Sequence, residues 1–380
     1  MLLTPIEEAK GSGDEAGSDD EDGEGWGGDS DSDLSGLEDL DGGDEEAAED
    51  GGDATYYVPP PKGVPPSRDW VQNSSLAADH VAAGSFETAM DLLNKQIGIV
   101  AFGPLKPVFM NVFAKSKVAV SANTGVDGLT VHMHRNWREA GSGEKNWRGA
   151  LPAIGITLSS LVTQLQGSYK LFSNGKVEAC IAAMRKIMYQ IPFLVVENQT
   201  DHEDAVELLE RCREYILACS LETERRTLTK SPDDLKRNCE IAAYMTHCNL
   251  DPVHLILTLK SAQTYAFKLK NFNDAGSFAR RLLDLGPKPE QAAKSRKIMQ
   301  ACDKDPSNAQ KLDYDSRNPF SVAGDEFTPI YKGTPSIKCG FCGISYRPSA
   351  MGKLCGICLV GEIGKEVSGV RFRLIKKGKW

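Results

Sequence analysis

The chain has 380 residues, of which 41% are apolar and 26% charged, and this length is typical of two or three domains of ~100–200 residues each. Its net charge of -9 averages two unlike parts. Residues 1–55 hold 21 Asp and Glu and a single Lys, whereas residues 56–380 hold 43 Lys and Arg and 32 Asp and Glu. No apolar stretch approaches the ~20 residues of a membrane span, and the start MLLTPIEEAK lacks the pattern of a signal peptide. Composition therefore predicts an acidic tail on a basic body and argues against an integral membrane or secreted protein.

Residues 1–55 are expected to be a disordered acidic linker, because Gly, Ser, Asp and Glu bury too little apolar surface to offset the entropy of ordering. Trp26 and the spaced Leu34, Leu37 and Leu40 are the exceptions within it. They are either a short linear motif that docks on a basic groove or incidental apolar residues in a spacer. Residues 56–74 are rich in Pro and are expected to form a stiff, extended connector.

Residues 75–305 are predicted to form a helical domain. One motif recurs in it: a small or polar turn residue, an apolar residue two positions on, and a small residue three positions further. This pattern is typical of a tetratricopeptide-like helix pair, in which the small residue lets two helices approach closely. The copies are 91 and 95 residues apart instead of ~34, which predicts irregular helical hairpins and no regular superhelix. The three copies are Gly84, Phe86 and Ala89; Gly175, Val177 and Cys180; and Lys270, Phe272 and Ala275.

A β-hairpin is predicted at about residues 117–134. Apolar and polar residues alternate over 117–121 and 129–134, and the segment 123–128 between them is rich in turn residues. Because a two-stranded ribbon is marginal alone in water, it must pack on its own chain or on a partner. His132 and His134 suggest a metal pair, but no third ligand is close in sequence, and an ordinary strand face is the favoured interpretation.

From residue 151 to residue 302 the pattern predicts helices throughout, punctuated by Gly and by residues that precede Pro. Residues 306–380 are rich in Gly, Pro, β-branched and aromatic residues, which predicts a small β-containing module. The fold class is therefore mainly α. The expected helices lie near residues 158–173, 176–189, 201–228, 233–246, 252–269, 273–285 and 289–303.

Four cysteines are clustered in the C-terminal module. Cys339, Cys342, Cys355 and Cys358 form two CxxC pairs that are separated by 12 residues. Each pair can direct two thiolates at one metal, so together they predict a zinc-ribbon-like site in which four cysteines hold a structural zinc and leave no open coordination position. Free thiols and a redox dithiol are the alternatives. The other six cysteines are scattered through helices as in cytosolic proteins.

No catalytic or phosphate-binding motif is present in the sequence, so we expect no enzyme and no small-molecule substrate. Two functional classes remain. One is a scaffold that docks a tetratricopeptide partner. The alternative is a zinc-ribbon nucleic-acid-binding protein with an acidic autoinhibitory tail, for which binding would weaken steeply with salt.

Several stretches resemble the C-terminal region of the coatomer alpha subunit. The most specific are NPFSVAGDEFTPIYKGTPSIKC at 318–339 and GEIGKEVSGVRFR at 361–373. Further stretches lie at 89–110, 146–166, 187–196 and 277–285, and the acidic segment around Trp26 is similar to the linker before this domain. The resemblance implies a C-terminal fragment that lacks the WD-repeat propellers of the family and therefore has no cargo site.

The resemblance implies a non-enzymatic subunit of a cytosolic vesicle coat, peripheral on Golgi membranes and coated vesicles. Such a subunit serves Golgi-to-ER retrograde and intra-Golgi transport together with the other coatomer subunits and binds no nucleic acid. Its partner would be the epsilon coatomer subunit, a tetratricopeptide protein that encircles a protruding β-hairpin. The expected contact residues are the apolar residues of the ribbon and two rim anchors: Val118, Val120, Leu129, Val131 and Met133, with Trp137 and Trp147.

Overall fold

The computed structural model describes residues 65–72, 74–121, 130–137, 151–196, 198–229 and 231–374. The predicted acidic linker over 1–55 and most of the predicted connector lie outside these residues. Within them the protein is mainly helical and carries several small antiparallel strand pairs, in agreement with the predicted class. None of the helices in the described ranges is long and apolar enough to cross a membrane.

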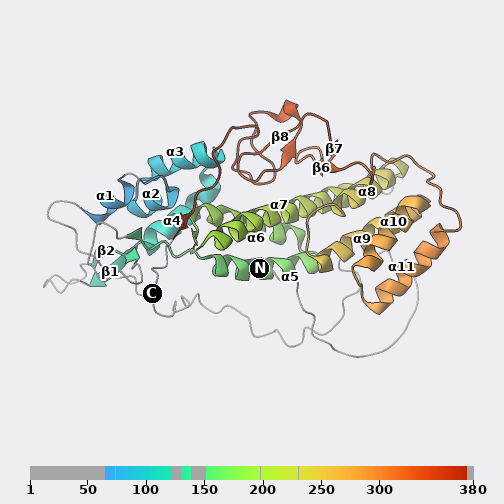
Figure 1. Ribbon diagram of the computed structural model, residues 1–380, viewed down its shortest axis with the longest axis horizontal. Coiled ribbons are helices and arrows are strands. Elements are labelled where there is room, and N and C mark those ends of the chain that lie inside the picture. The colour runs from blue at the N-terminus through green and yellow to red at the C-terminus, as the bar shows by residue number, and fades with distance from the viewer. Residues whose placement is uncertain are drawn as a thin grey trace.

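A row of seven helices runs along the elongated molecule, and each helix packs against the next one in the chain (Figure 1). The predicted helices are confirmed, with ends within two residues of those expected. Pro at the first helical turn and Asp or Ser before it account for this accuracy at α8 and α9, where Ser231 and Asp251 cap the helix with their side chains. The row comprises α5 Leu158–Ser173, α6 Val177–Gln190, α7 Gln199–Thr227, α8 Pro232–Met245, α9 Pro252–Lys268, α10 Phe272–Asp284 and α11 Pro289–Cys302.

In the described part of the chain, four further helices precede this row: α1 Pro66–Val71, α2 Ala77–Ala83, α3 Phe86–Ile97 and α4 Lys106–Lys115. The extended conformation predicted for the connector is wrong over α1, because Trp70 packs into the core with 2% of its surface exposed and the burial of this ring outweighs the local preference for extension. Helix α4 was not predicted from the sequence. Its Pro107 lies in the first turn, where a missing N–H costs nothing.

The recurring turn motif has the same conformation in all three copies. The turn residues adopt left-handed φ angles of +87°, +67° and +59°, and a helix starts two residues later. The small residue three positions on is fully buried each time, so the motif marks the close approach of two helices. These residues are Gly84, Gly175 and Lys270 for the turn, Phe86, Val177 and Phe272 for the helix start, and Ala89, Cys180 and Ala275 for the buried position.

The predicted β-hairpin is confirmed. Strand β1 Lys117–Ser121 pairs antiparallel with β2 Thr130–His134, and Val120 lies opposite Val131. A second short pair, β3 Asn136–Trp137 with β4 Leu151–Pro152, follows directly and forms the base of the hairpin. The ribbon lies at the end of the molecule next to α1, α2 and α4 (Figure 1).

The C-terminal module lies on one side of the helical row, near α3, α6 and α7 (Figure 1). Its strands are β6 Phe320–Val322, β7 Pro329–Tyr331, β8 Ile337–Lys338 and β9 Ser345–Tyr346. One continuous hydrophobic cluster contains residues of the N-terminal helices, of α5–α7 and of the four-cysteine segment, and a second lies between α8 and α11. The final strand, β10 Arg373–Leu374, pairs in parallel with β5 Val195–Val196. The module is therefore built into the helical body.

Candidate functional site

The hairpin has two faces of different character. Val118 lies opposite Met133 and Val120 opposite Val131, and since alternate pairs of a ribbon share a face, these four positions form one apolar stripe. The other stripe contains Lys117 opposite His134. Val118 is 40% exposed, so the apolar stripe is open to solvent at this position.

The Lys117–His134 pair attaches the hairpin to the body. The rings of His134 and Trp70 in α1 are nearly perpendicular, with their centres 5.1 Å apart, and Lys117 Nζ lies 3.7 Å from the centre of the Phe113 ring in α4. Burial, together with the nearby charge of Lys117, lowers the pKa of His134 and keeps the imidazole neutral at physiological pH. The chain thus uses the Lys117–His134 end of this stripe for its own packing.

The four cysteines of the C-terminal module converge on one point. All four side chains are buried, and their sulfur atoms lie within 4.8 Å of one another. Cys339 Sγ lies 3.7 Å from Cys358 Sγ, and Cys342 Sγ lies 3.6 Å from Cys355 Sγ. A tetrahedral zinc with ~2.3 Å bonds to sulfur needs S···S distances of about 3.8 Å. The cluster therefore has the donor set and the size to hold a metal ion of this kind.

The two CxxC segments fold into matching turns. Gly343 N–H donates to the Cys339 carbonyl at 3.0 Å, and Leu359 N–H donates to the Cys355 carbonyl at 2.9 Å. Each donor residue has a left-handed φ, +74° at Gly343 and +60° at Leu359. Glycine adopts this conformation freely, whereas leucine does so at a cost of about 1 kcal/mol. The second turn therefore keeps the geometry of the first in spite of this cost.

Two residues that the sequence did not single out complete the cysteine site. The buried Tyr346 hydroxyl lies 3.1 Å from Cys355 Sγ, and Gly361 N–H donates to Cys358 Sγ at 3.4 Å. A Cβ at Gly361 would lie 2.7 Å from Cys339 Sγ, so only glycine fits there. Cys spacing alone could not reveal either residue, because both contacts depend on how the turns fold back.

The thiols of the cluster titrate as a group. Hydrogen bonds from the neighbouring thiols, that of Cys339 above all, lower the pKa of Cys355, whereas burial raises the pKa of Cys342. Loss of one proton is thus favoured, and further negative charge in the same buried space is disfavoured. A divalent cation would supply the compensating charge, and the donor set therefore fits a thiolate-bound metal.

A sequence profile of the family described as the C-terminus of the coatomer (COPI) alpha subunit matches residues 4–377. The chain belongs to this family. It is 39% identical over 351 residues to coatomer subunit alpha of Dictyostelium discoideum, a match that covers 91% of this chain and 28% of that protein. It is 39% identical over 318 residues to coatomer subunit alpha-2 of Arabidopsis thaliana, with 83% and 26% covered, respectively. Putative coatomer subunit alpha of Schizosaccharomyces pombe is 33% identical over 304 residues, with 80% and 25% covered. The chain spans about a quarter of the length of these relatives.

The predicted contact residues differ in how the structure describes them: some lie on the ribbon, one lies in β3, and two lie outside the described ranges. Val118 is exposed and Met133 is half-buried on the ribbon, while Val120 and Val131 occupy the same pair of the register. Trp137 lies in β3, opposite Leu151. The remaining two predicted residues, Leu129 and Trp147, lie outside the described part of the chain. Among the described residues, no third metal-ligating side chain joins His132 and His134.

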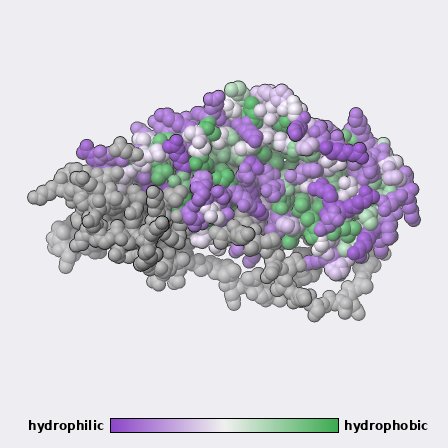
Figure 2. Space-filling view, viewed as in Figure 1, coloured by the Kyte–Doolittle hydropathy of each residue, from purple (hydrophilic) through white to green (hydrophobic). Residues whose placement is uncertain are grey.

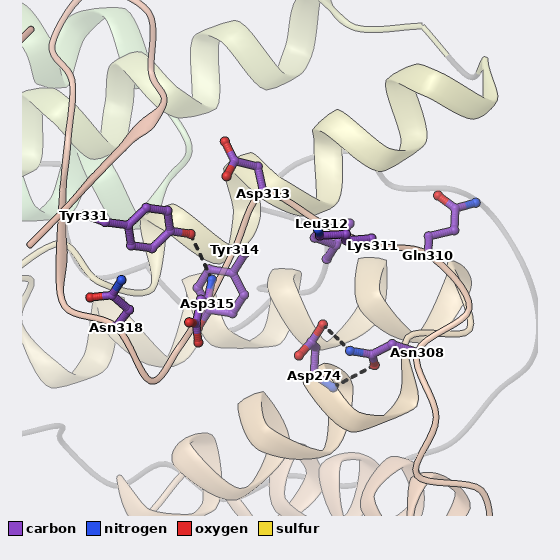
Figure 3. Close-up of a pocket in the computed structure, with 10 residues that line it drawn as sticks. All are labelled: Asp274, Asn308, Gln310, Lys311, Leu312, Asp313, Tyr314, Asp315, Asn318 and Tyr331. Atoms are coloured by element: carbon purple, nitrogen blue, oxygen red, sulfur yellow. Dashed lines mark hydrogen bonds between the residues drawn. The ribbon is translucent and has the colours of Figure 1, made fainter. Parts of the chain in front are cut away.

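A cavity of about 520 Å³ lies between α10 and the segment that follows α11 (Figure 3). Its polar groups are engaged with one another: Asn308 donates to Asp274 at 3.0 Å, and the Tyr331 hydroxyl accepts from the Asp315 N–H at 3.0 Å. Burial raises the pKa of Asp274. These bonds hold the segment against the helices, which is a structural role.

Proposed function

We propose that the chain is a structural, non-enzymatic component of the coatomer vesicle coat and that its β1–β2 ribbon inserts into the epsilon coatomer subunit. Membership in the coatomer alpha subunit family supports the coat over the nucleic-acid alternative. The observation that carries the docking proposal is the contrast between two neighbouring positions on opposite stripes of the ribbon. The Lys117–His134 pair packs on the chain's own helices, while Val118 of the apolar stripe faces solvent.

The energetics of the ribbon favour an external partner. Full burial of an aliphatic side chain contributes about 1.5–3 kcal/mol. Four apolar positions along one stripe can therefore supply a substantial part of a binding free energy, even after the entropy of association is subtracted. A tetratricopeptide protein, whose stacked helix pairs form an extended concave surface, has the shape to surround such a ribbon.

Replacing Val120 and Val131 with Asp tests this proposal. The two charges would enter the apolar contact without partners, so capture of the chain by immobilised epsilon subunit should be abolished while the far-ultraviolet circular dichroism spectrum stays unchanged. The matched control is His132→Asp, an exposed position on the opposite stripe that should leave capture intact. Undiminished capture of the double variant, or equal loss with His132→Asp, would contradict the proposal.

We further propose that the four cysteines hold a structural zinc ion, a role that the convergence of four buried sulfur atoms supports. All four positions would be filled by protein, so the ion would stabilise the module and supply no catalytic site. The test is the metal content of the purified chain. One zinc per chain is expected, and its absence from protein purified without chelators would contradict the assignment.

The remaining parts of the proposal concern the setting. The helical body is proposed to be of the tetratricopeptide-like type, supported by the three copies of its turn motif. The chain is proposed to act in the cytoplasm, on the cytosolic face of Golgi membranes and coated vesicles, in retrograde and intra-Golgi transport with the other coatomer subunits. A fluorescently tagged chain should follow Golgi markers, and should lose this location when Val120 and Val131 are both replaced with Asp.

A further inference from the structure

The cysteine module exposes apolar side chains beside the metal-binding turns. Met351 is 69% exposed and Leu354 is 48% exposed, whereas most large apolar residues of the described chain are buried. Both lie on the segment that leads into the second CxxC turn, and its backbone bonds to residues 361–363: Gly352 N–H donates to the Ile363 carbonyl at 2.9 Å. In Figure 2, green and pale residues lie at the crest of the molecule, where this module is placed in Figure 1. We call the surface formed by Met351, Leu354, Lys338 and Lys353 the module rim.

The rim is positively charged. Lys353 stands between the two apolar residues in sequence, and Lys338 lies across the same backbone ladder, since Ile363 N–H donates to the Lys353 carbonyl and Gly364 N–H to the Lys338 carbonyl. Both lysine side chains are exposed. Residues 330–374 as a whole carry seven Lys and Arg against two Asp and Glu. An occupant of this surface should therefore combine acidic with apolar side chains.

The chain itself contains a segment of this chemistry. Leu34, Leu37 and Leu40 are spaced by three residues among Asp and Glu, within the part of the chain that carries 21 acidic residues and one basic residue. Apolar anchors at this spacing, surrounded by charge, are typical of short segments that bind a complementary groove. Neither the proposed coat contact of the ribbon nor the metal site uses these residues.

We propose that the acidic segment around Leu34, Leu37 and Leu40 docks on the module rim of the same chain, with the leucines against Met351 and Leu354 and the carboxylates against Lys338 and Lys353. An intramolecular contact of this kind would cover the rim until a competing acidic partner displaced the segment.

The connection is long enough for this contact. The 28 residue steps from Leu37 to Pro65 span up to about 95 Å when extended. The longest helix of the described chain, α7 with 29 residues, measures about 44 Å. From Pro65 the path is short, because α1 packs on α2 and α2 on α3, and the Gly98 carbonyl at the end of α3 accepts from the Glu362 N–H of the module at 2.9 Å. Tethering also raises the effective concentration of the segment to the millimolar range.

Photo-cross-linking in the full chain tests the proposal. A benzophenone amino acid at position 37 should give intramolecular cross-links to the peptide that contains Met351 and Leu354, identified by mass spectrometry after digestion. The yield should fall at least about five-fold in the Lys338→Glu/Lys353→Glu variant and between about 50 and 500 mM salt, because the attraction between exposed charges is screened. Both substitutions are at exposed positions, so the fold should be retained and is checked by thermal unfolding.

The matched control is Val206→Asp, an exposed apolar position on α7 that should leave the cross-link unchanged. Cross-links that join two copies of the chain, cross-links to other surfaces, or no cross-link at all would each overturn the proposal. So would a yield that is insensitive to the charge-reversal variant. These outcomes are distinct from a failure of the ribbon proposal, because the assay contains no partner protein.

Discussion

Replacing Arg373 with Met is expected to lower the free energy of unfolding by about 3–5 kcal/mol, because the change leaves a buried carboxylate without its counter-charge. Arg373 in β10 forms an ion pair with Asp79 in α2, and both side chains are buried. The guanidinium also donates from Nη1 to the Pro152 carbonyl at 2.9 Å. In the variant, Asp79 keeps the hydrogen bond from the Ser74 hydroxyl at 2.8 Å, but this bond cannot replace a full positive charge.

Urea unfolding followed by circular dichroism measures this loss. The matched control is Arg280→Met, which removes the ion pair between Arg280 and Asp303 at 2.8 Å. The side chains of this pair are 59% and 52% exposed, respectively. Water already screens that pair, so a loss of at most about 1 kcal/mol is expected. In the double variant Asp79→Leu/Arg373→Met no charge of the pair remains unpaired, and most of the lost stability should return. Equal losses for Arg373→Met and Arg280→Met would refute the reasoning.

Three further predictions concern the cysteine module and the core. Gly361→Ala should cost about 1–3 kcal/mol, since its Cβ would meet Cys339 Sγ at 2.7 Å, whereas Gly103→Ala, with no atom near its Cβ, should cost less than about 1 kcal/mol in the same urea titration. If the cluster holds zinc, chelation or Cys342→Ser should lower the unfolding temperature measured by calorimetry, and an unchanged temperature would argue for free thiols. Burial lowers the pKa of His254 to about 4. Below about pH 6.5 the unfolded chain therefore binds a proton at this histidine, whereas the folded chain does not. The contribution of His254 to the unfolding free energy should therefore fall by up to about 1.4 kcal/mol per pH unit as the pH drops from about 6.5 towards 5. Burial lowers the pKa of His247 to about 4 as well, so His254→Gln should remove about half of the combined slope.

Features encoded by near neighbours in sequence were predictable. Helices of the central row were predicted from residue pairs such as Ser231-Pro232, because capping and the constraint of proline act within one turn. The hairpin followed from strict alternation, and the convergence of the four cysteines from the CxxC spacing. The start of α7 is a local feature that was nevertheless placed two residues late: the helix was expected from residue 201, whereas Asn198 caps it by accepting from the Asp201 N–H at 2.8 Å.

Features that depend on distant contacts were not predictable. Nothing near Tyr346 in the sequence indicates that its hydroxyl reaches Cys355 Sγ, because that contact exists only after β9 and the second CxxC turn fold together. The helical state of α1 likewise depends on the core that receives Trp70. The proline-rich composition predicted an extended connector there. Composition contains no information about the core against which Trp70 packs.

The pairing of β10 with β5 and the Asp79–Arg373 ion pair have a consequence for biosynthesis. Asp79 emerges from the ribosome about 290 residues before its counter-ion Arg373. Strand β5 is likewise synthesised well before β10, the strand with which it pairs. The helices made first can form early, but Asp79 stays without its counter-charge and β5 without its parallel neighbour until translation reaches β10. A nascent chain stalled before this point should therefore remain protease-sensitive around α2.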